Sequence, residues 1–128
     1  MADVANKSMV LCVDDDLVFL QGLVEVLMAC RCDVAATSDV KTALELVRRE
    51  PVSLAIVDCE MPAMPGAALA SAMRRIRPEM AIILLSSSSE ATTEGPKPAD
   101  KYVTKASESR QTSRAVSSRL QWSSAPAA

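Results

Sequence analysis

The stretch that decides the fold is LAIVD at residues 54–58, four apolar residues that end on an aspartate. A second apolar run, MVLCV at residues 9–13, leads in the same way into Asp14, Asp15 and Asp16. In an open parallel α/β sheet, ligands bind outside the carboxyl ends of the strands, so acids at two such ends can converge. The two runs therefore predict one strongly anionic pocket at one edge of a sheet.

Strand-like and helix-like periods alternate along the chain, which is typical of an α/β protein with a parallel sheet wrapped by helices. Short apolar or alternating runs predict five strands, at about 9–13, 32–36, 53–58, 81–85 and 101–104. Within the strand at 53–58, residues 54–57 are continuously apolar, which suits a strand that is buried on both faces.

Three helices are expected between the first four strands, each from apolar residues at helical spacing. Asp15 or Asp16 can cap the first helix, and Ser38 or Asp39 can cap the second. The third helix should end before Pro78. The expected apolar stripes are Leu17, Leu20, Val24, Leu27 and Met28 in the first helix, Val40, Ala43, Leu44 and Val47 in the second, and Leu69, Met73 and Ile76 in the third.

The pattern breaks over residues 86–100, which contain no Val, Leu, Ile, Met or aromatic residue and are interrupted by Gly95, Pro96 and Pro98. Such a segment cannot form a helix with a buried apolar face. Residues 107–121 predict a terminal helix with a thin stripe. With 128 residues, we expect one domain over 1–122 and a disordered tail or linker remnant over 123–128.

Composition excludes several classes of function. Aromatic residues make up 2% of the chain and the net charge is −2, which disfavours nucleic-acid binding by base stacking or by a basic surface. The four cysteines lack CxxC spacing and the chain has no histidine, so we expect reduced thiols rather than a zinc site. No apolar run has the length of a signal peptide or a membrane span, and we expect a cytoplasmic protein.

Polar side chains follow four of the predicted strands: Asp14 with Asp15, then Asp58, Ser86 and Lys105. Three carboxylates about 5 Å apart would repel by roughly 3 kcal/mol per pair at an effective dielectric of 20, so the group needs a cation. Ligands that are all oxygen favour Mg²⁺. A carboxylate beside Mg²⁺ and an ammonium group can attack a phosphoryl donor and become an aspartyl phosphate.

Each of these residues also has an ordinary structural explanation when it is taken alone. The first acids could cap a helix, Asp58 could simply end a strand, Ser86 could belong to a serine-rich linker, and Lys105 could be a solvated lysine. The complementary set at four strand ends of one sheet favours a functional site over four separate coincidences.

Four segments resemble the receiver domain of two-component response regulators. They are VLCVDDD at 10–16, LAIVDCEMPAMPG at 54–66, IILLS at 82–86 and YVTK at 102–105. The resemblance covers about residues 8 to 121. It implies a flavodoxin-like, doubly wound sheet of five parallel strands in the order 2-1-3-4-5.

The resemblance also implies roles for single residues. Asp58 would accept a phosphoryl group from a sensor histidine kinase or a phosphotransfer protein. Asp14 and Asp15 would bind Mg²⁺ together with Asp58 and the backbone carbonyl of Glu60.

Further roles concern the phosphoryl group after transfer. The Ser86 hydroxyl would move to bond a phosphoryl oxygen, the Tyr102 ring would turn inward, and Lys105 would pair with the phosphoryl group. Glu60 and Ser88 stand at positions where side chains tune loss of the phosphoryl group in this family.

The chain departs from the family pattern twice, which leaves alternatives open. Ala106 stands where the family usually has a proline, and the peptide bond between the lysine and that proline is usually cis. A cis peptide bond before a residue other than proline costs about 3 kcal/mol. Residues 86–100 stand where the family has its fourth helix, so that helix is expected to be missing or degenerate. A degenerate receiver that acts as a constitutive protein-interaction module is therefore the alternative function.

Two further expectations concern activity and partners. A small phosphohydrolase is disfavoured because Cys59 and Glu60 place no second aspartate two positions after Asp58, so we expect no turnover of an external substrate. Output should pass through contact with an unknown downstream protein. If nothing covers one side of the last two strands, residues 82–85 and 102–103 would expose an apolar patch suited to a homodimer.

Overall fold

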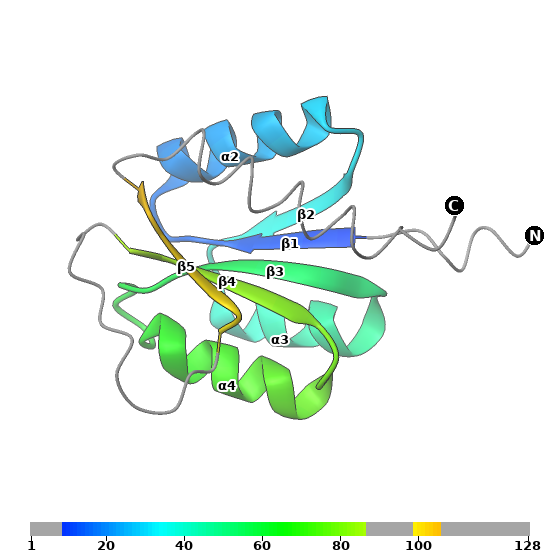
Figure 1. Ribbon diagram of the computed structural model, residues 1–128. Coiled ribbons are helices and arrows are strands. Elements are labelled where there is room, and N and C mark those ends of the chain that lie inside the picture. Colours follow the sequence, from blue (N-terminus) through cyan, green and yellow to red (C-terminus); the bar gives the residue numbers. More distant parts are fainter. Residues whose placement is uncertain (1–8, 87–98, 106–128) are drawn as a thin grey trace, which may run out of the picture.

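The computed structural model describes residues 9–86 and 99–105. The described elements follow one another as β1 (Met9–Val13), α2 (Leu17–Ala29), β2 (Asp33–Thr37), α3 (Val40–Arg49), β3 (Val52–Asp58), α4 (Gly66–Ile76), β4 (Ala81–Ser86) and β5 (Lys101–Thr104) (Figure 1). Several predictions lie outside the described residues: the state of the family's fourth helix, the helix at 107–121, the tail at 123–128, Ser88 and the peptide bond to Ala106.

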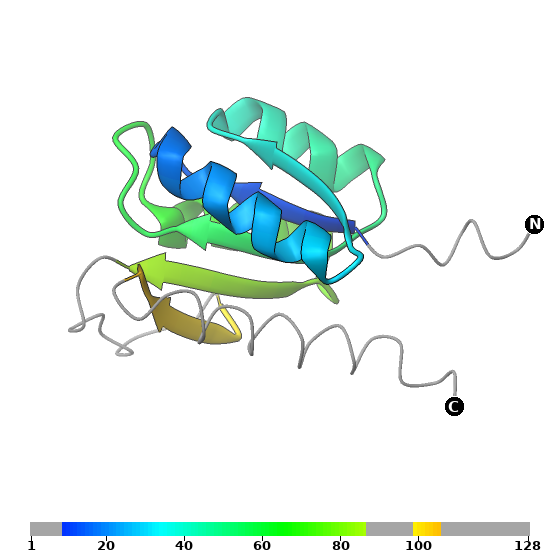
Figure 2. The same ribbon diagram turned by 90° about the horizontal axis from the view of Figure 1, so that it is seen from above.

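The five strands form one parallel sheet in the order β2-β1-β3-β4-β5, which confirms the doubly wound, flavodoxin-like topology. Helix α2 covers one face of this sheet, and α3 and α4 cover the other (Figures 1 and 2). All strands point the same way, so their carboxyl ends lie along one edge of the sheet.

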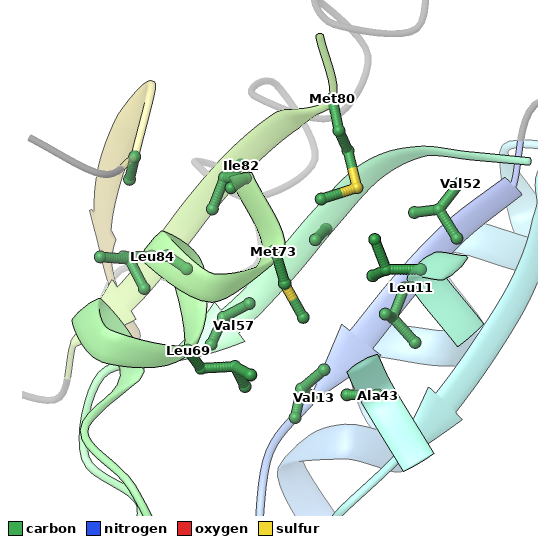
Figure 3. Close-up of a cluster of buried hydrophobic side chains, with 14 of the residues drawn as sticks. Leu11, Val13, Ala43, Val52, Val57, Leu69, Met73, Met80, Ile82 and Leu84 are labelled. Carbon is green, nitrogen blue, oxygen red and sulfur yellow. The ribbon is translucent and has the colours of Figure 1, made fainter. Parts of the chain in front are cut away.

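Alternation along the strands builds two apolar cores. In β3, Ala55 and Val57 face α3 and α4, while Leu54 and Ile56 face α2. Figure 3 shows the core on the α3 and α4 side, in which the Met73 side chain of α4 packs against the sheet. Burial on both faces explains why β3 reads as a continuous apolar run rather than an alternating one.

The apolar stripe predicted for α2 is partly wrong. Leu20, Leu23 and Leu27 are its buried residues, whereas Leu17 is 64% exposed and Met28 is 62% exposed. At 100° per residue, Leu17 and Met28 lie about 60° and 80° around the helix from Leu20, on the side away from Leu23. The sheet therefore buries a narrower stripe, shifted toward Leu23.

The cap predictions are confirmed for two helices. Asp16 caps α2, and its carboxylate accepts hydrogen bonds from the N–H groups of Val18 and Phe19. Asp39 caps α3 and accepts a hydrogen bond from the Thr42 N–H. In each pair of predicted cap candidates, one residue is therefore the N-cap of the helix.

The apolar patch that suggested a homodimer is not exposed. Residues 82–85 are at most 1% exposed, and Val103 is 4% exposed. Dimerisation through this side of the sheet remains an untested prediction, and an exposed apolar patch no longer supports it. Within 9–86 and 99–105, no helix is long and apolar enough to cross a membrane.

Candidate functional site

The structure brings the predicted strand-end residues together at the carboxyl edge of the sheet. Carboxylate oxygens of Asp14, Asp15 and Asp58 all lie within 4.8 Å of one another. Asp14, Asp58 and Ser86 are the buried polar residues among those described, whereas Asp15 is exposed to solvent. The group thus combines two buried carboxylates with a third that is exposed to solvent.

Lys105 supplies the positive charge of the site. Its Nζ lies 2.9 Å from Asp14 Oδ2 and 3.3 Å from Asp58 Oδ1. Burial by itself lowers the pKa of Lys105, but the two carboxylates outweigh burial, so the pKa lies above its usual value. Lys105 is therefore a fixed ammonium that partly balances the acids.

Asp58 ionises less readily than an ordinary aspartic acid. Burial and the nearby Asp14 raise its pKa to about 6, against the opposing effects of the Glu60 N–H and of Lys105. The Glu60 N–H donates to Asp58 Oδ1 at 3.2 Å. One ammonium is thus insufficient to offset the loss of water around this carboxylate.

The donor set fits a hard divalent cation such as Mg²⁺. It consists of carboxylate oxygens, and no His or Cys side chain belongs to the group within the described ranges. Buried Asp14 Oδ2 receives no well-formed hydrogen bond from the described chain, although the Lys105 ammonium lies beside it. Asp14, Asp15 and Asp58 are the side chains that would hold the ion.

The three consecutive acids after β1 have separate roles in the structure. Asp14 Oδ1 accepts a hydrogen bond of 2.9 Å from the Asp16 N–H, which fixes the carboxylate of Asp14 in the site. Asp16 points away and caps α2. Asp15 remains exposed between them, so a cation could draw on both a rigid and a solvated ligand.

Gly66 lets α4 begin directly against the end of β3. Its N–H donates to the Cys59 carbonyl at 2.9 Å. A Cβ at residue 66 would collide with the backbone oxygen of Asp58 and lie 2.7 Å from the Cys59 Cα. The absence of a side chain here therefore determines how closely the loop after Asp58 folds back on the site.

Ser86 and Glu60 face each other across the site. The Ser86 Oγ donates to Glu60 Oε2 at 3.3 Å, so the Glu60 side chain lies over the end of β4. Tyr102 stands opposite Leu84 in the β4–β5 register and packs partly buried against the core on the α3 and α4 side. Burial raises the pKa of the Tyr102 hydroxyl.

Sequence reasoning missed Phe19. The Lys105 Nζ lies 4.6 Å from the centre of the Phe19 ring, over its face. The available signal was that the chain's one phenylalanine stands in the first turn of the helix that follows the acids. The total aromatic content of 2% gives no sign of where this ring lies.

Comparison with known proteins identifies the family. A sequence model described as "Response regulator receiver domain" matches residues 10–117. The chain belongs to the response regulator receiver domain family. The receiver domain is also 41% identical over 58 residues to the Fimbriae Z protein of Salmonella typhimurium, a stretch that covers 45% of this chain and 28% of that protein.

Solved receiver structures have the same fold. A CheY-like receiver domain protein from Methanospirillum hungatei JF-1 superposes with a TM-score of 0.81 at 23% identity, over 94% of this receiver domain and 98% of that chain. Response regulator TrrA from Thermotoga maritima, solved in complex with Mg²⁺ and BeF, gives a TM-score of 0.80 at 26% identity, over 88% and 98% of the two chains.

Proposed function

We propose that this receiver domain accepts a phosphoryl group on Asp58 in a Mg²⁺-dependent reaction. The donor would be a sensor histidine kinase or a phosphotransfer protein, and output would pass through contacts with a downstream protein. The observation that carries the proposal is the buried Asp58 carboxylate, with Lys105 at 3.3 Å and two further carboxylates within 4.8 Å.

The proposed chemistry uses Asp58 as the nucleophile. One of its oxygens forms a bond to phosphorus as the bond from phosphorus to the donor's imidazole nitrogen breaks, and the imidazole keeps the electron pair. Bound Mg²⁺ would supply positive charge to the phosphoryl oxygens. Lys105, already oriented by Asp14 and Asp58, would also stabilise charge on these oxygens.

The proposed response to phosphorylation starts at Ser86. Its hydroxyl would leave the Glu60 carboxylate and donate to a phosphoryl oxygen, and Tyr102 would turn toward the space that Ser86 vacates. Glu60 would also tune loss of the phosphoryl group, since its carboxylate already lies beside the site. Ser88 is proposed to act with Glu60 on the ground of the family resemblance alone.

The test is a phosphorylation assay on the intact chain. Acetyl phosphate and Mg²⁺ should add the mass of one phosphoryl group to the native protein and none to Asp58→Ala, as read by intact mass spectrometry. Asp16→Ala is the matched control, since its carboxylate caps α2, and it should still be labelled. Equal labelling of Asp58→Ala, or no labelling of the native chain, would refute the proposal.

The alternative is a constitutive interaction module, which the alanine at position 106 favours. It predicts weak Mg²⁺ binding and no conformational response to beryllofluoride. Amide NMR spectra recorded with Mg²⁺, before and after addition of beryllofluoride, separate the two functions. Shifts at Asp58, Ser86 and Lys105 would support the phosphoacceptor, and unchanged spectra would support the module.

A further inference from the structure

Among the described residues, the Lys105 ammonium has close neighbours of two chemical kinds. Two are carboxylate oxygens, Asp14 Oδ2 at 2.9 Å and Asp58 Oδ1 at 3.3 Å. The third is the face of the Phe19 ring, whose centre is 4.6 Å away. A cation over an aromatic face is attracted by the negative charge density of the ring, and the observed distance lies within the range of this interaction.

Contacts of both its backbone and its side chain hold Phe19 beside Lys105. Asp16 caps α2 and accepts a hydrogen bond of 3.2 Å from the Phe19 N–H, which fixes the backbone of this residue. Its side chain packs against the core on the α2 side of the sheet. Leu17 and Val18, in the same turn, are 64% and 83% exposed. Phe19 is thus the apolar residue of this turn that points to the site.

The two kinds of neighbour respond differently to the reaction. Transfer of a phosphoryl group to Asp58 converts its carboxylate into an acyl phosphate, and a bound cation would engage the carboxylate of Asp14. The contacts of Lys105 with Asp14 and with Asp58 therefore both change during the proposed reaction. This inference rests on the proposed function. The Phe19 ring changes in neither event, so it is the constant contact of the ammonium.

We infer that Phe19 is a positioning residue for Lys105, which holds the ammonium beside Asp58 through a cation–π contact while the anions around it are exchanged. The ring acts through Lys105 and does not touch the reacting atoms.

The first experiment compares substitutions at position 19 in the phosphorylation assay with acetyl phosphate and Mg²⁺. Phe19→Leu keeps an apolar side chain of similar size and loses the ring, and it should be labelled roughly threefold to tenfold more slowly. Phe19→Tyr keeps the ring face and should restore the native rate. Val18→Ala, an exposed change in the same turn, is the control and should leave the rate unchanged.

The second experiment reads the contact itself without phosphorylation. The ε-methylene protons of Lys105 should be shifted upfield by the ring in the native protein, and this shift should disappear in Phe19→Leu. Because Phe19 is the sole phenylalanine of the chain, fluorinated phenylalanine can be introduced there alone. Fluorination lowers the charge density of the ring face, so the labelling rate should fall with each added fluorine.

The outcomes separate this inference from the proposed function. A native chain that is never labelled on Asp58 would overturn both. A labelled native chain with equal rates for Phe19→Leu, or rates indifferent to fluorination, would overturn the role of Phe19 and leave Asp58 as the phosphoacceptor. A Lys105 shift that survives Phe19→Leu would also overturn the contact.

Discussion

Asp58 carries a charge that the metal-free fold disfavours. Its pKa of about 6 lies above the usual value of 3.8, chiefly because of burial, so the native state binds a proton more tightly than the unfolded chain. Stability therefore falls as pH rises from about 4 to 6 and stays lower above that window. This cost is the residue-scale reason that the site should take up a cation.

Asp58→Asn is therefore expected to stabilise the metal-free protein at pH 8, by about 1–3 kcal/mol. The gain should be much smaller near pH 4, where the Asp58 carboxyl is protonated in the folded state and close to half protonated in the unfolded state. Urea unfolding in the presence of a chelator at the two pH values measures the difference. Asp15→Asn is the control: this carboxylate is exposed, and its removal should change stability less. A gain independent of pH would contradict the explanation.

The cysteines should differ sharply in reactivity. Burial raises the pKa of the Cys12 thiol to about 12, and Cys30 is exposed. Because the thiolate is the reactive form, alkylation of the native protein should modify Cys30 rapidly and Cys12 only after unfolding. Peptide mass mapping after a short treatment with iodoacetamide checks this, with urea-unfolded protein as the reference. Rapid modification of native Cys12 would show that β1 opens locally.

Sequence could identify the acids, the hydroxyl and the amine of the site because residue type at a strand end carries that information. It could not identify the contacts of Phe19 with Lys105 or of Glu60 with Ser86. Both depend on where side chains from different elements point once α2 and the loop after β3 are packed.

At the scale of elements, periodicity predicts the described strands to within one residue at each end and the three described helices between them, since each element buries a face of defined period. It failed on the stripe of α2, because a helix rich in apolar residues does not reveal how wide a surface the sheet offers. Periodicity therefore predicts Leu17 and Met28 in the core, whereas the structure buries Leu23 there.

Gly66 and Gly22 give a matched test of element packing. Gly66→Ala should destabilise the protein by about 2 kcal/mol or more and slow phosphorylation, since its Cβ meets backbone atoms of Asp58 and Cys59. Gly22→Ala, inside α2 with nothing within 4 Å of the added Cβ, should stabilise by about 0.5–1 kcal/mol. Urea unfolding measures both, and equal stability of the two variants would refute the close approach of α4.

For the whole molecule, strand order could not be read from periodicity, which identifies elements but says nothing of which strands pair. Resemblance to the receiver family supplied the order 2-1-3-4-5, and the structure has it. That order places β1 and β3 side by side at the centre of the sheet. The anionic pocket inferred from two apolar runs thus requires long-range pairing that local sequence does not encode.

The stability of the whole domain should depend on which cation balances the carboxylates of Asp14, Asp15 and Asp58. Lys105, whose side chain is 17% exposed, faces carboxylates that are 2% and 3% exposed. Lys105→Met leaves those charges unpaired and should lower the stability of the metal-free protein by about 3–5 kcal/mol.

Added Mg²⁺ should then recover more stability in Lys105→Met than in the native chain, because the ion replaces the missing charge and binds only the folded state. Thermal unfolding with and without Mg²⁺ measures this, and Lys101→Met on the exposed start of β5 is the control. An equal rise in the two variants would show that the ion does not replace the charge of Lys105, and no rise in either would show that the acids do not form a metal site.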